Sequence, residues 1–517
     1  MGIEIIYQDA DIQQLLEDRR INKLMHMIWM SREDLQIAFD ISTYQGQQGL
    51  FNWYASSAFR EYGIEPGAFD FLTKSTERSA PSPKTGYYHL LMRMESRLAR
   101  LARRLPNSVR SSGKSLWLRF LSMSVRSLSD ACPQNAYSPR ISNDSVEALG
   151  VPGANLIGYA LAESGMGEHV RMSAASFAST NVGFNVVNFN HGVPSRQKAS
   201  LDHGKLSTRN TYRTNIFHIN ADQLLNVYVT QGEKFFHNRF NVSYPFWELS
   251  KLPEEWILPL NLMDEVWAPT KFIQDTLSRA LNKAVPHMPV SIELPEVKKR
   301  SRRYFGIPEN SYAFFCTFDF FSYIHRKNPW AVVNAFRKAF PNGNENVTLV
   351  IKVMNGNEKD TGWRELKEIS MNDKRITLIN KTLTKDDLIS LKLECGCYVS
   401  LHRAEGLGRG PMEAMLLGKP TIVTNYSGNT DYSKKDNSCL VDYSLIPVQE
   451  GQYLHYRGQV WADPDVEHAA WYMKRLVADV ELGAHLGQTA KQFVSTNFSP
   501  AKCGEIYKQH LGKLGLI

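Results

Sequence analysis

The sequence predicts an α/β protein with two successive parallel-sheet domains and a helical extension in front of them. After residue 150, short apolar runs alternate with helical segments, which is the pattern of parallel strands joined by helices. The alternation begins again after Pro289, while helical spacing dominates before residue 150. A chain of 517 residues also exceeds what a single hydrophobic core supports.

The first domain is expected at residues 149–287, after an extension at 1–148. Its predicted strands lie at 155–160, 184–189, 215–219 and 265–268, and its predicted helices at 168–179 and 271–281. The second domain is expected at 288–485. Its predicted strands lie at 312–318, 347–353, 376–379, 397–401 and 420–424, with helices at 330–340, 385–393 and 411–417. Residues 486–517 are expected to be helical and to return to the first domain.

Composition indicates a folded protein, since 43% of the residues are hydrophobic and 11% aromatic. No run of 18 apolar residues predicts a membrane-spanning helix, and residues 1–11 lack the layout of a signal peptide. Of the six cysteines, Cys395 and Cys397 are close together, but no second pair stands at a metal-ligand spacing. We therefore expect core cysteines, no metal and a cytoplasmic protein.

Positive charge is concentrated in the extension. Residues 84–126 contain ten Lys or Arg and one acid, Glu95. Four arginines recur every three or four residues within 87–105, beside a stripe of Leu and Met, so a helix there would be amphipathic. Residues 87–126 would suit an anionic membrane surface; the alternative is a helix that packs on the protein and solvates its arginines. No nucleic-acid partner is expected, because no recognisable nucleic-acid module accompanies the charge.

The most informative stretch is 400–431, where a predicted strand runs into a glycine-rich loop and then a helix that starts at Pro411. Free backbone N–H groups at such a helix start favour a diphosphate or a polyhydroxylated sugar. Glu405 lies in the loop and Glu413 in the first turn of the helix. Glu413 alone could merely complement the helix dipole.

The segment E-G-L-G-R-G-P-M-E resembles the Glu-x7-Glu motif of glycosyltransferase family 4. The resemblance implies a GT-B fold, with two Rossmann-like domains and a cleft between them. It also implies a retaining enzyme with a nucleotide-sugar donor and no cofactor. Glu405 would contact the donor sugar and Glu413 the ribose, while the N–H groups of Gly406, Leu407 and Gly408 would approach the sugar and phosphate.

A second similarity lies in 318–336, where the family has an arginine and then a lysine opening a helix, both on the diphosphate. Lys327 stands directly before the predicted helix and would stabilise the departing nucleoside diphosphate in place of a metal. The family's arginine is missing from its usual place, 320–322, which reads Phe-Phe-Ser, so Arg326 is the nearest substitute. The alternative is two solvated bases at a helix start, where cations are unfavourable.

The third similarity, in 155–173, makes Gly165 and Gly167 candidates for a loop between the donor phosphate and the acceptor. A G-x-G after a strand is also ordinary turn chemistry. A dinucleotide oxidoreductase would need a third glycine where this chain has Val170. His218 and Glu248 lie in segments similar to the family's acceptor side, although a lone histidine on a strand is more often structural.

Together these features predict a retaining, metal-independent hexosyltransferase. Its expected donor is a UDP- or GDP-linked sugar and its expected acceptor a glycan or lipid-linked glycan in bacterial polysaccharide synthesis, such as that of lipopolysaccharide. The protein would be cytoplasmic or peripheral at the inner face of the membrane. The alternatives are another GT-B enzyme, an epimerase or a phosphorylase, and a non-catalytic scaffold that binds membrane or partners.

Overall fold

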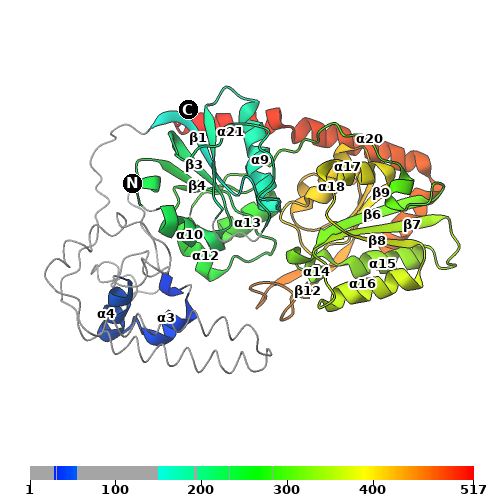
Figure 1. The fold of residues 1–517 in the computed structure, drawn as a ribbon, viewed down its shortest axis with the longest axis horizontal. Helices are drawn as coiled ribbons and strands as arrows, with labels where there is room; N and C mark the ends of the chain where they lie inside the picture. The colour runs from blue at the N-terminus through cyan, green and yellow to red at the C-terminus, as the bar shows by residue number, and fades with distance from the viewer. Residues whose placement is uncertain (1–27, 31, 55–149, 191–194, 232, 282) are drawn as a thin grey trace. The chain divides into compact units, whose positions relative to one another are not determined.

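The computed structural model describes residues 28–30, 32–54, 150–190, 195–231, 233–281 and 283–517 (Figure 1). The chain divides into two compact units. The first consists of Met1–Leu149, Ala221–Phe240 and Glu254–Asp264, and the second of Gly150–Asn220, Asn241–Pro253 and Glu265–Ile517. The basic helices predicted within 87–126 lie outside the described residues.

The elements described wholly within the first unit are helices. They are α3 (Glu33–Ala38), α4 (Tyr44–Trp53), α10 (Ala221–Gln231), α11 (Glu233–Phe236) and α12 (Glu254–Asn261), and α10 packs against α12.

The first sheet contains β1 (Val151–Gly158), β2 (Phe184–Asn188), β3 (Tyr212–His218), β4 (Phe240–Ser243) and β5 (Glu265–Val266). Its strand order is β2-β1-β3-β4-β5, and β1 pairs in parallel with both β2 and β3. The order reverses between β1 and β3, which makes the carboxyl end of β1 a topological switch point, where open α/β sheets bind ligands. Helix α9 (Gly165–Ala178) follows β1 there, and α13 (Lys271–Ala280) follows β5.

The second sheet has six parallel strands in the order β11-β10-β9-β6-β7-β8. They are β6 (Tyr312–Asp319), β7 (Val347–Met354), β8 (Ile376–Asn380), β9 (Cys397–Ser400), β10 (Thr421–Thr424) and β11 (Cys439–Val441). Its switch point lies between β6 and β9. The loops after these two strands therefore meet at one place.

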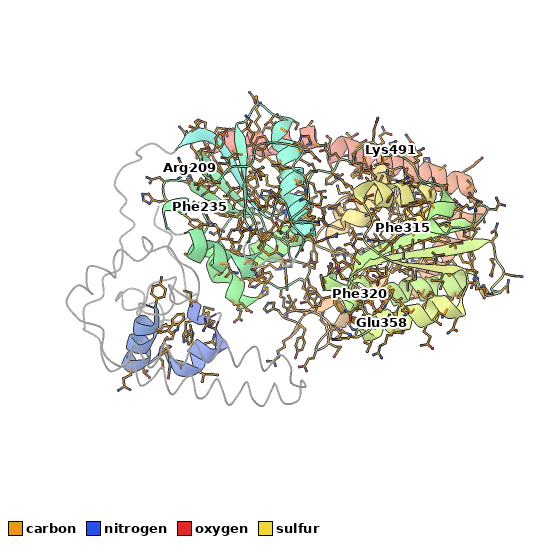
Figure 2. The ribbon with its side chains drawn as sticks, viewed as in Figure 1. Arg209, Phe235, Phe315, Phe320, Glu358 and Lys491 are labelled. Carbon is orange, nitrogen blue, oxygen red and sulfur yellow. The ribbon has the colours of Figure 1, made fainter. Side chains whose placement is uncertain are left out.

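Helices cover both faces of the second sheet (Figure 1). On one face α15 (Pro329–Ala339), α16 (Thr361–Asn372) and α19 (Val466–Ala478) enclose a core that includes Phe314 and Phe336. On the other face lie α17 (Lys385–Glu394) and α18 (Arg409–Leu416), packed over Phe315, which is labelled in Figure 2. Burial on both faces explains why these strands read as nearly continuous apolar runs.

Short helical segments, a strand pair and the last two helices complete the second unit. Helix α14 (Ile324–Lys327) and the 3-10 turns at Arg302–Phe305, Phe320–Ser322 and Gly428–Asp431 lie in loops, and β12 (Tyr443–Pro447) pairs antiparallel with β13 (Val460–Pro464). Helix α20 (Val480–Asn497) packs on α18, and α21 (Pro500–Lys513) packs on α9. At that contact the Tyr507 hydroxyl donates to the carbonyl of Pro289 at 2.6 Å.

The α/β prediction with two parallel sheets is confirmed, and the predicted strands recur with shifts of one to a few residues at their ends. The helix predicted from residue 168 begins at Gly165, because the Ser164 hydroxyl caps it by accepting from the Gly167 N–H at 3.2 Å. The helix predicted from Pro411 begins at Arg409. In the part of the chain that the structure describes, none of the helices has the length and hydropathy needed to cross a membrane.

Candidate active site

Two loops of the second sheet meet at its switch point. The loop after β6 carries Arg326 and Lys327, and the loop after β9 carries Glu405. The Arg403 N–H donates to the carbonyl of Arg326 at 2.8 Å, and the Asn328 amide donates to the carbonyl of Leu401 at 3.1 Å. These bonds fix the two loops against each other, so residues far apart in the sequence form one cluster.

Glu405 is the centre of this cluster and is buried. It accepts from Arg326 Nη1 at 3.1 Å and from Lys327 Nζ. Burial alone would raise the pKa of Glu405, but Lys327 and Arg326 outweigh it and hold that pKa at about 2. The carboxylate is therefore ionised at neutral pH, and Arg326 and Lys327 both face it.

Arg326 is buried between two carboxylates. Glu248 Oε1 lies 3.8 Å from its Nη2, whereas Glu405 is bound by Nη1. Burial lowers the pKa of Arg326, but Glu405 and then Glu248 outweigh it and raise that pKa. The Nε–H of Arg326 is buried and has no acceptor among the described residues. A buried donor is costly unless an acceptor reaches it, so this atom suits a ligand oxygen.

Lys327 stands directly before Asn328, the N-cap of α15, so the prediction that it precedes a helix is confirmed. Arg326 and Lys327 also form the last turn of the short helix α14, and Asn328 has the left-handed conformation (φ 50°). Residues 320–322, where the resemblance implied an arginine, form a 3-10 turn, and the Phe320 ring packs against those of Phe318 and Trp363 at 5.5 and 6.3 Å between centroids.

The glycine-rich loop before α18 presents unpaired backbone N–H groups. Among the described residues, those of Gly406, Leu407 and Gly408 donate no hydrogen bond. Gly408 has φ 82°, and a Cβ there would lie 2.7 Å from the hydroxyl of Tyr432, which donates to the carbonyl of Leu407 at 3.0 Å. Glycine is required at 408, and the loop can offer its N–H groups to a phosphate or sugar oxygen.

Glu413, the second glutamate of the motif, lies in α18 and is also buried. It accepts from Arg409 Nε at 2.8 Å and from Lys392 Nζ. Burial would raise the pKa of Glu413, but Arg409 and Lys392 outweigh it and hold that pKa at about 2. The structure thus places Glu413 in its own ion-pair network, apart from the cations that contact Glu405.

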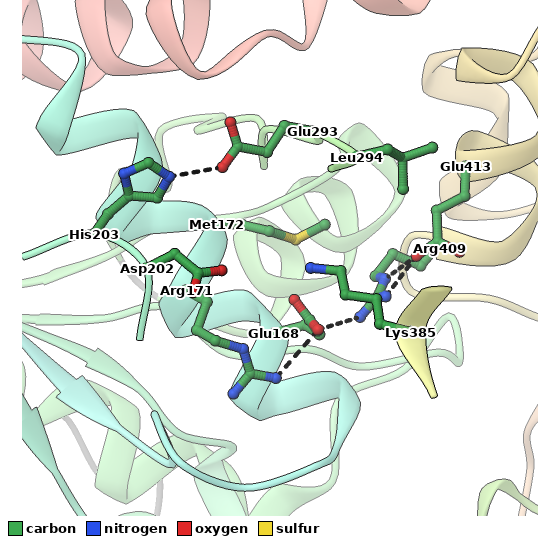
Figure 3. Close-up of a pocket in the computed structure, with 10 residues that line it drawn as sticks. All are labelled: Glu168, Arg171, Met172, Asp202, His203, Glu293, Leu294, Lys385, Arg409 and Glu413. Atoms are coloured by element: carbon green, nitrogen blue, oxygen red, sulfur yellow. Dashed lines mark hydrogen bonds and ion pairs between the residues drawn. The ribbon is translucent and has the colours of Figure 1, made fainter. Parts of the chain in front are cut away.

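A pocket beside Glu413 joins the two sheet domains (Figure 3). Its cavity volume is about 40 Å³, within about 470 Å³ of space that no protein atom fills and that is partly open to solvent. In it Glu168 lies between two arginines, 3.3 Å from Arg171 Nη2 and 3.7 Å from Arg409 Nη1. The lining residues are Glu168, Arg171, Met172, Asp202, His203, Glu293, Leu294, Lys385, Arg409 and Glu413.

Three further residues predicted in the first domain are Gly165, Gly167 and His218. Gly165 faces open space, whereas a Cβ on Gly167 would lie 2.2 Å from the carbonyl of Ala162, so glycine at 167 serves the turn itself. His218 is fully buried, with its ring edge-on to His169 at 4.6 Å, and burial lowers its pKa to about 3. The His218 side chain has no exposed surface, so it cannot contact an acceptor in this position. A structural role for His218, the alternative considered from the sequence, fits its burial.

Glu248, the other predicted acceptor residue, belongs to the Arg326 cluster. Its second carboxylate oxygen accepts from the Tyr453 hydroxyl at 2.7 Å, and 22% of its side chain is exposed. Sequence reasoning missed Tyr453, Lys392 and Arg409. Only Arg409 had a signal, its place inside the Glu-x7-Glu motif four residues before Glu413.

Comparison with known proteins agrees with this geometry. Residues 317–493 match the family model of the glycosyl transferases group 1, which covers β7 to β13 and both motif loops of the second sheet. The chain is therefore similar to this family over its second domain, as the motif predicted. No curated protein sequence matches the chain significantly.

Solved structures extend the similarity to the whole two-domain fold. HepE of Anabaena, in complex with UDP and glucose, is 13% identical and covers 70% of this chain and 99% of its own, with a TM-score of 0.52. The sucrose-phosphate synthase of Thermosynechococcus elongatus is 13% identical with the same coverage and a TM-score of 0.53. At this identity the likeness shows the fold alone, and the predicted GT-B fold is confirmed.

Proposed function

We propose that this protein is a retaining glycosyltransferase that moves a hexose from a nucleoside diphosphate sugar to a glycan or lipid-linked glycan. The observation that carries the proposal is the cluster of buried Arg326 and Glu405 with partly exposed Lys327 at the switch point of the second sheet. It lies beside a glycine loop with unpaired N–H groups, within the segment that matches the group 1 family.

Each residue has a distinct role in this proposal. Arg326, Lys327 and the loop N–H groups bind the diphosphate and stabilise the charge that develops on it as the sugar leaves. Glu405 positions the donor sugar and is not a covalent nucleophile. Glu413 binds the ribose of the donor. Two protein cations supply the positive charge, so transfer is proposed to proceed without a metal.

The acceptor is proposed to approach the donor cluster from the first domain. Glu248 is its candidate from the first domain, because its partly exposed carboxylate lies at the donor cluster. A UDP-linked donor is supported by the UDP and glucose in the HepE complex. A role in bacterial polysaccharide synthesis, at the inner face of the membrane through residues 87–126, rests on the resemblance of the motifs and the charge of that segment.

The direct test incubates purified protein with UDP- and GDP-sugars and glycan acceptors, with and without EDTA. We expect one donor to be consumed at a rate that EDTA leaves unchanged, and NMR of the product to show the anomeric configuration of the donor. Consumption that requires a divalent metal would contradict metal independence, and an inverted product would contradict retention. An epimerase would interconvert donors without an acceptor, a phosphorylase would require phosphate, and a scaffold would consume no donor.

A further inference from the structure

The loop between β12 and β13, residues 448–459, connects the second domain to the first. We call it the hairpin loop. The Gln459 amide donates to the carbonyl of Lys251 at 2.8 Å, and the Lys251 N–H donates back to Gln459 Oε1 at 3.2 Å. The Trp247 ring lies 5.9 Å from that of Tyr453 and 6.1 Å from that of His455. Hydrogen bonds between the Gln459 side chain and the Lys251 backbone, together with ring contacts, hold the hairpin loop on the segment that carries Glu248.

Tyr453 is the residue of the hairpin loop that reaches the diphosphate cluster. It is buried, and its ring centroid lies 5.7 Å from the guanidinium carbon of Arg326. The same ring meets that of Tyr323 edge-on, with 4.8 Å between centroids, and Tyr323 precedes Arg326 by three residues. Its hydroxyl donates to Glu248, whose other oxygen faces Arg326. Tyr453 therefore contacts both Arg326 and the carboxylate beside it.

We infer that Tyr453 and Glu248 position Arg326 for the diphosphate. An arginine side chain has several rotatable bonds, and an aromatic face restricts the plane of its guanidinium. Glu405 and the carbonyl of Ala404, at 2.9 Å, hold one edge of Arg326, while Tyr453 and Glu248 hold its face and its other edge. This inference rests on the proposed function, since it concerns the binding of the same diphosphate.

The position of Arg326 in the chain explains why it depends on these contacts. Phe320, earlier in the same loop, packs against the core of the second domain. Arg326 comes from a later position, directly before Lys327, and reaches the site from the end of a one-turn helix. Glu405 and the carbonyl of Ala404 hold one edge of the Arg326 side chain, and the hairpin loop and Glu248 supply its further contacts. Positioning of Arg326 is thus coupled to contact between the two domains.

Two substitutions at Tyr453 separate its contacts. Tyr453→Phe keeps the ring on Arg326 and removes the hydrogen bond to Glu248, whereas Tyr453→Leu removes both. Glu248→Gln removes the charge near Arg326 and keeps the shape. Tyr456→Phe is the control, because Tyr456 lies in the same loop and has no contact with Glu248 or Arg326. We expect kcat to fall about tenfold in Tyr453→Leu and less in Tyr453→Phe, with a smaller change in donor KM.

The deciding experiment is calorimetric titration of the full chain with UDP, UMP, GDP and GMP. The wild type should bind one diphosphate more tightly than its monophosphate, because Arg326 acts on the diphosphate. Tyr453→Leu should reduce that preference about tenfold and leave monophosphate affinity within twofold, while Tyr456→Phe changes neither. An unchanged preference in Tyr453→Leu, or equal losses for both nucleotides, would overturn the positioning role and leave the proposed function standing. No nucleotide binding by folded wild type would overturn both.

Discussion

Glu405 and Glu413, eight residues apart in one motif, are both buried and both paired with two cations, but their cations differ in origin and exposure. The partners of Glu405 come from the loop after β6, and 20% of the Lys327 side chain is exposed. Those of Glu413 are Lys392 of α17, whose side chain is 2% exposed, and Arg409 of its own helix. Lys327 can therefore reach a ligand, whereas Lys392 neutralises a carboxylate inside the fold.

This difference suggests that the two glutamates of the motif have different roles in transfer and in donor binding. At Glu405 the partly exposed Lys327 adjoins the site where charge would develop during transfer, so changes there should act on kcat. At Glu413 the carboxylate is paired with Arg409 and with Lys392, which is buried inside the fold, and the pocket beside it is lined by neither Arg326 nor Lys327. Changes there should act on KM.

The largest expected effect is that of Glu405→Gln. The substitution keeps the shape of the side chain but leaves Arg326 and Lys327 without their shared counter-charge. We expect kcat to fall about 100-fold or more, with donor KM changed far less, as steady-state kinetics will show. Glu467→Gln is the control, because Glu467 pairs with Lys338 at an exposed site. Wild-type kcat in Glu405→Gln would remove Glu405 from the active site.

The sequence predicts the Glu405 end of the site better than its surroundings. Glu405 and Lys327 stand in short motifs whose meaning depends only on neighbouring residues, a strand end, glycines and a helix. Tyr453 is brought to Arg326 by long-range folding, and no local pattern marks it. Strand β12, which leads into its loop, is mostly exposed and lacks the alternation that predicts a strand.

The first residue of a helix is also harder to predict from the sequence than the helix itself. Pro411 predicts a helix start because its missing N–H costs nothing in the first turn. The structure begins α18 two residues earlier, since Gly408 can take a left-handed conformation and Pro411 still lies where no intrahelical donor is needed. The existence of α18 was predictable from its residues. Its first residue was not, because it depends on the left-handed conformation of Gly408, and the sequence does not show which of the loop glycines adopts that conformation.

The pH dependence of the free energy of unfolding separates the two glutamates from the buried histidines. We expect stability to fall first below pH 6.5, and neither glutamate accounts for that first loss. Each has its pKa lowered from 4.5 to about 2, so its contribution is complete above pH 4.5 and is lost as pH falls toward 2. Burial lowers the pKa of His218 from 6.5 to about 3, so its contribution is complete above pH 6.5 and declines below it. At pH 5 this loss amounts to about 2 kcal/mol.

Urea unfolding of wild type and His218→Phe at several pH values checks this assignment. We expect the free energy of unfolding of the wild type to fall between pH 6.5 and 5, and His218→Phe to fall less over that range. His169 and His402, whose pKa values are also lowered by burial, account for the remaining decline. Equal declines in the two proteins would show that His218 is not the group responsible.

A smaller effect is expected from Glu413→Gln. The variant removes one charge-assisted contact to the ribose but leaves the diphosphate cluster intact. We expect donor KM to rise about tenfold with kcat within threefold of wild type. The measurement is a donor titration at saturating acceptor. A fall in kcat as large as that of Glu405→Gln would erase the proposed division between the two glutamates.

The smallest effect is expected from Arg409→Met, which tests whether Arg409 is a partner of Glu413 or a ligand-binding group. Arg409 is 31% exposed and pairs with both Glu413 and Glu168. In the variant Lys392 still neutralises Glu413, and Arg171 still pairs with Glu168. Donor KM should therefore change less than threefold, with kcat unaffected. A tenfold rise in KM would mean that Arg409 itself contacts the donor, because neither glutamate loses its last cation.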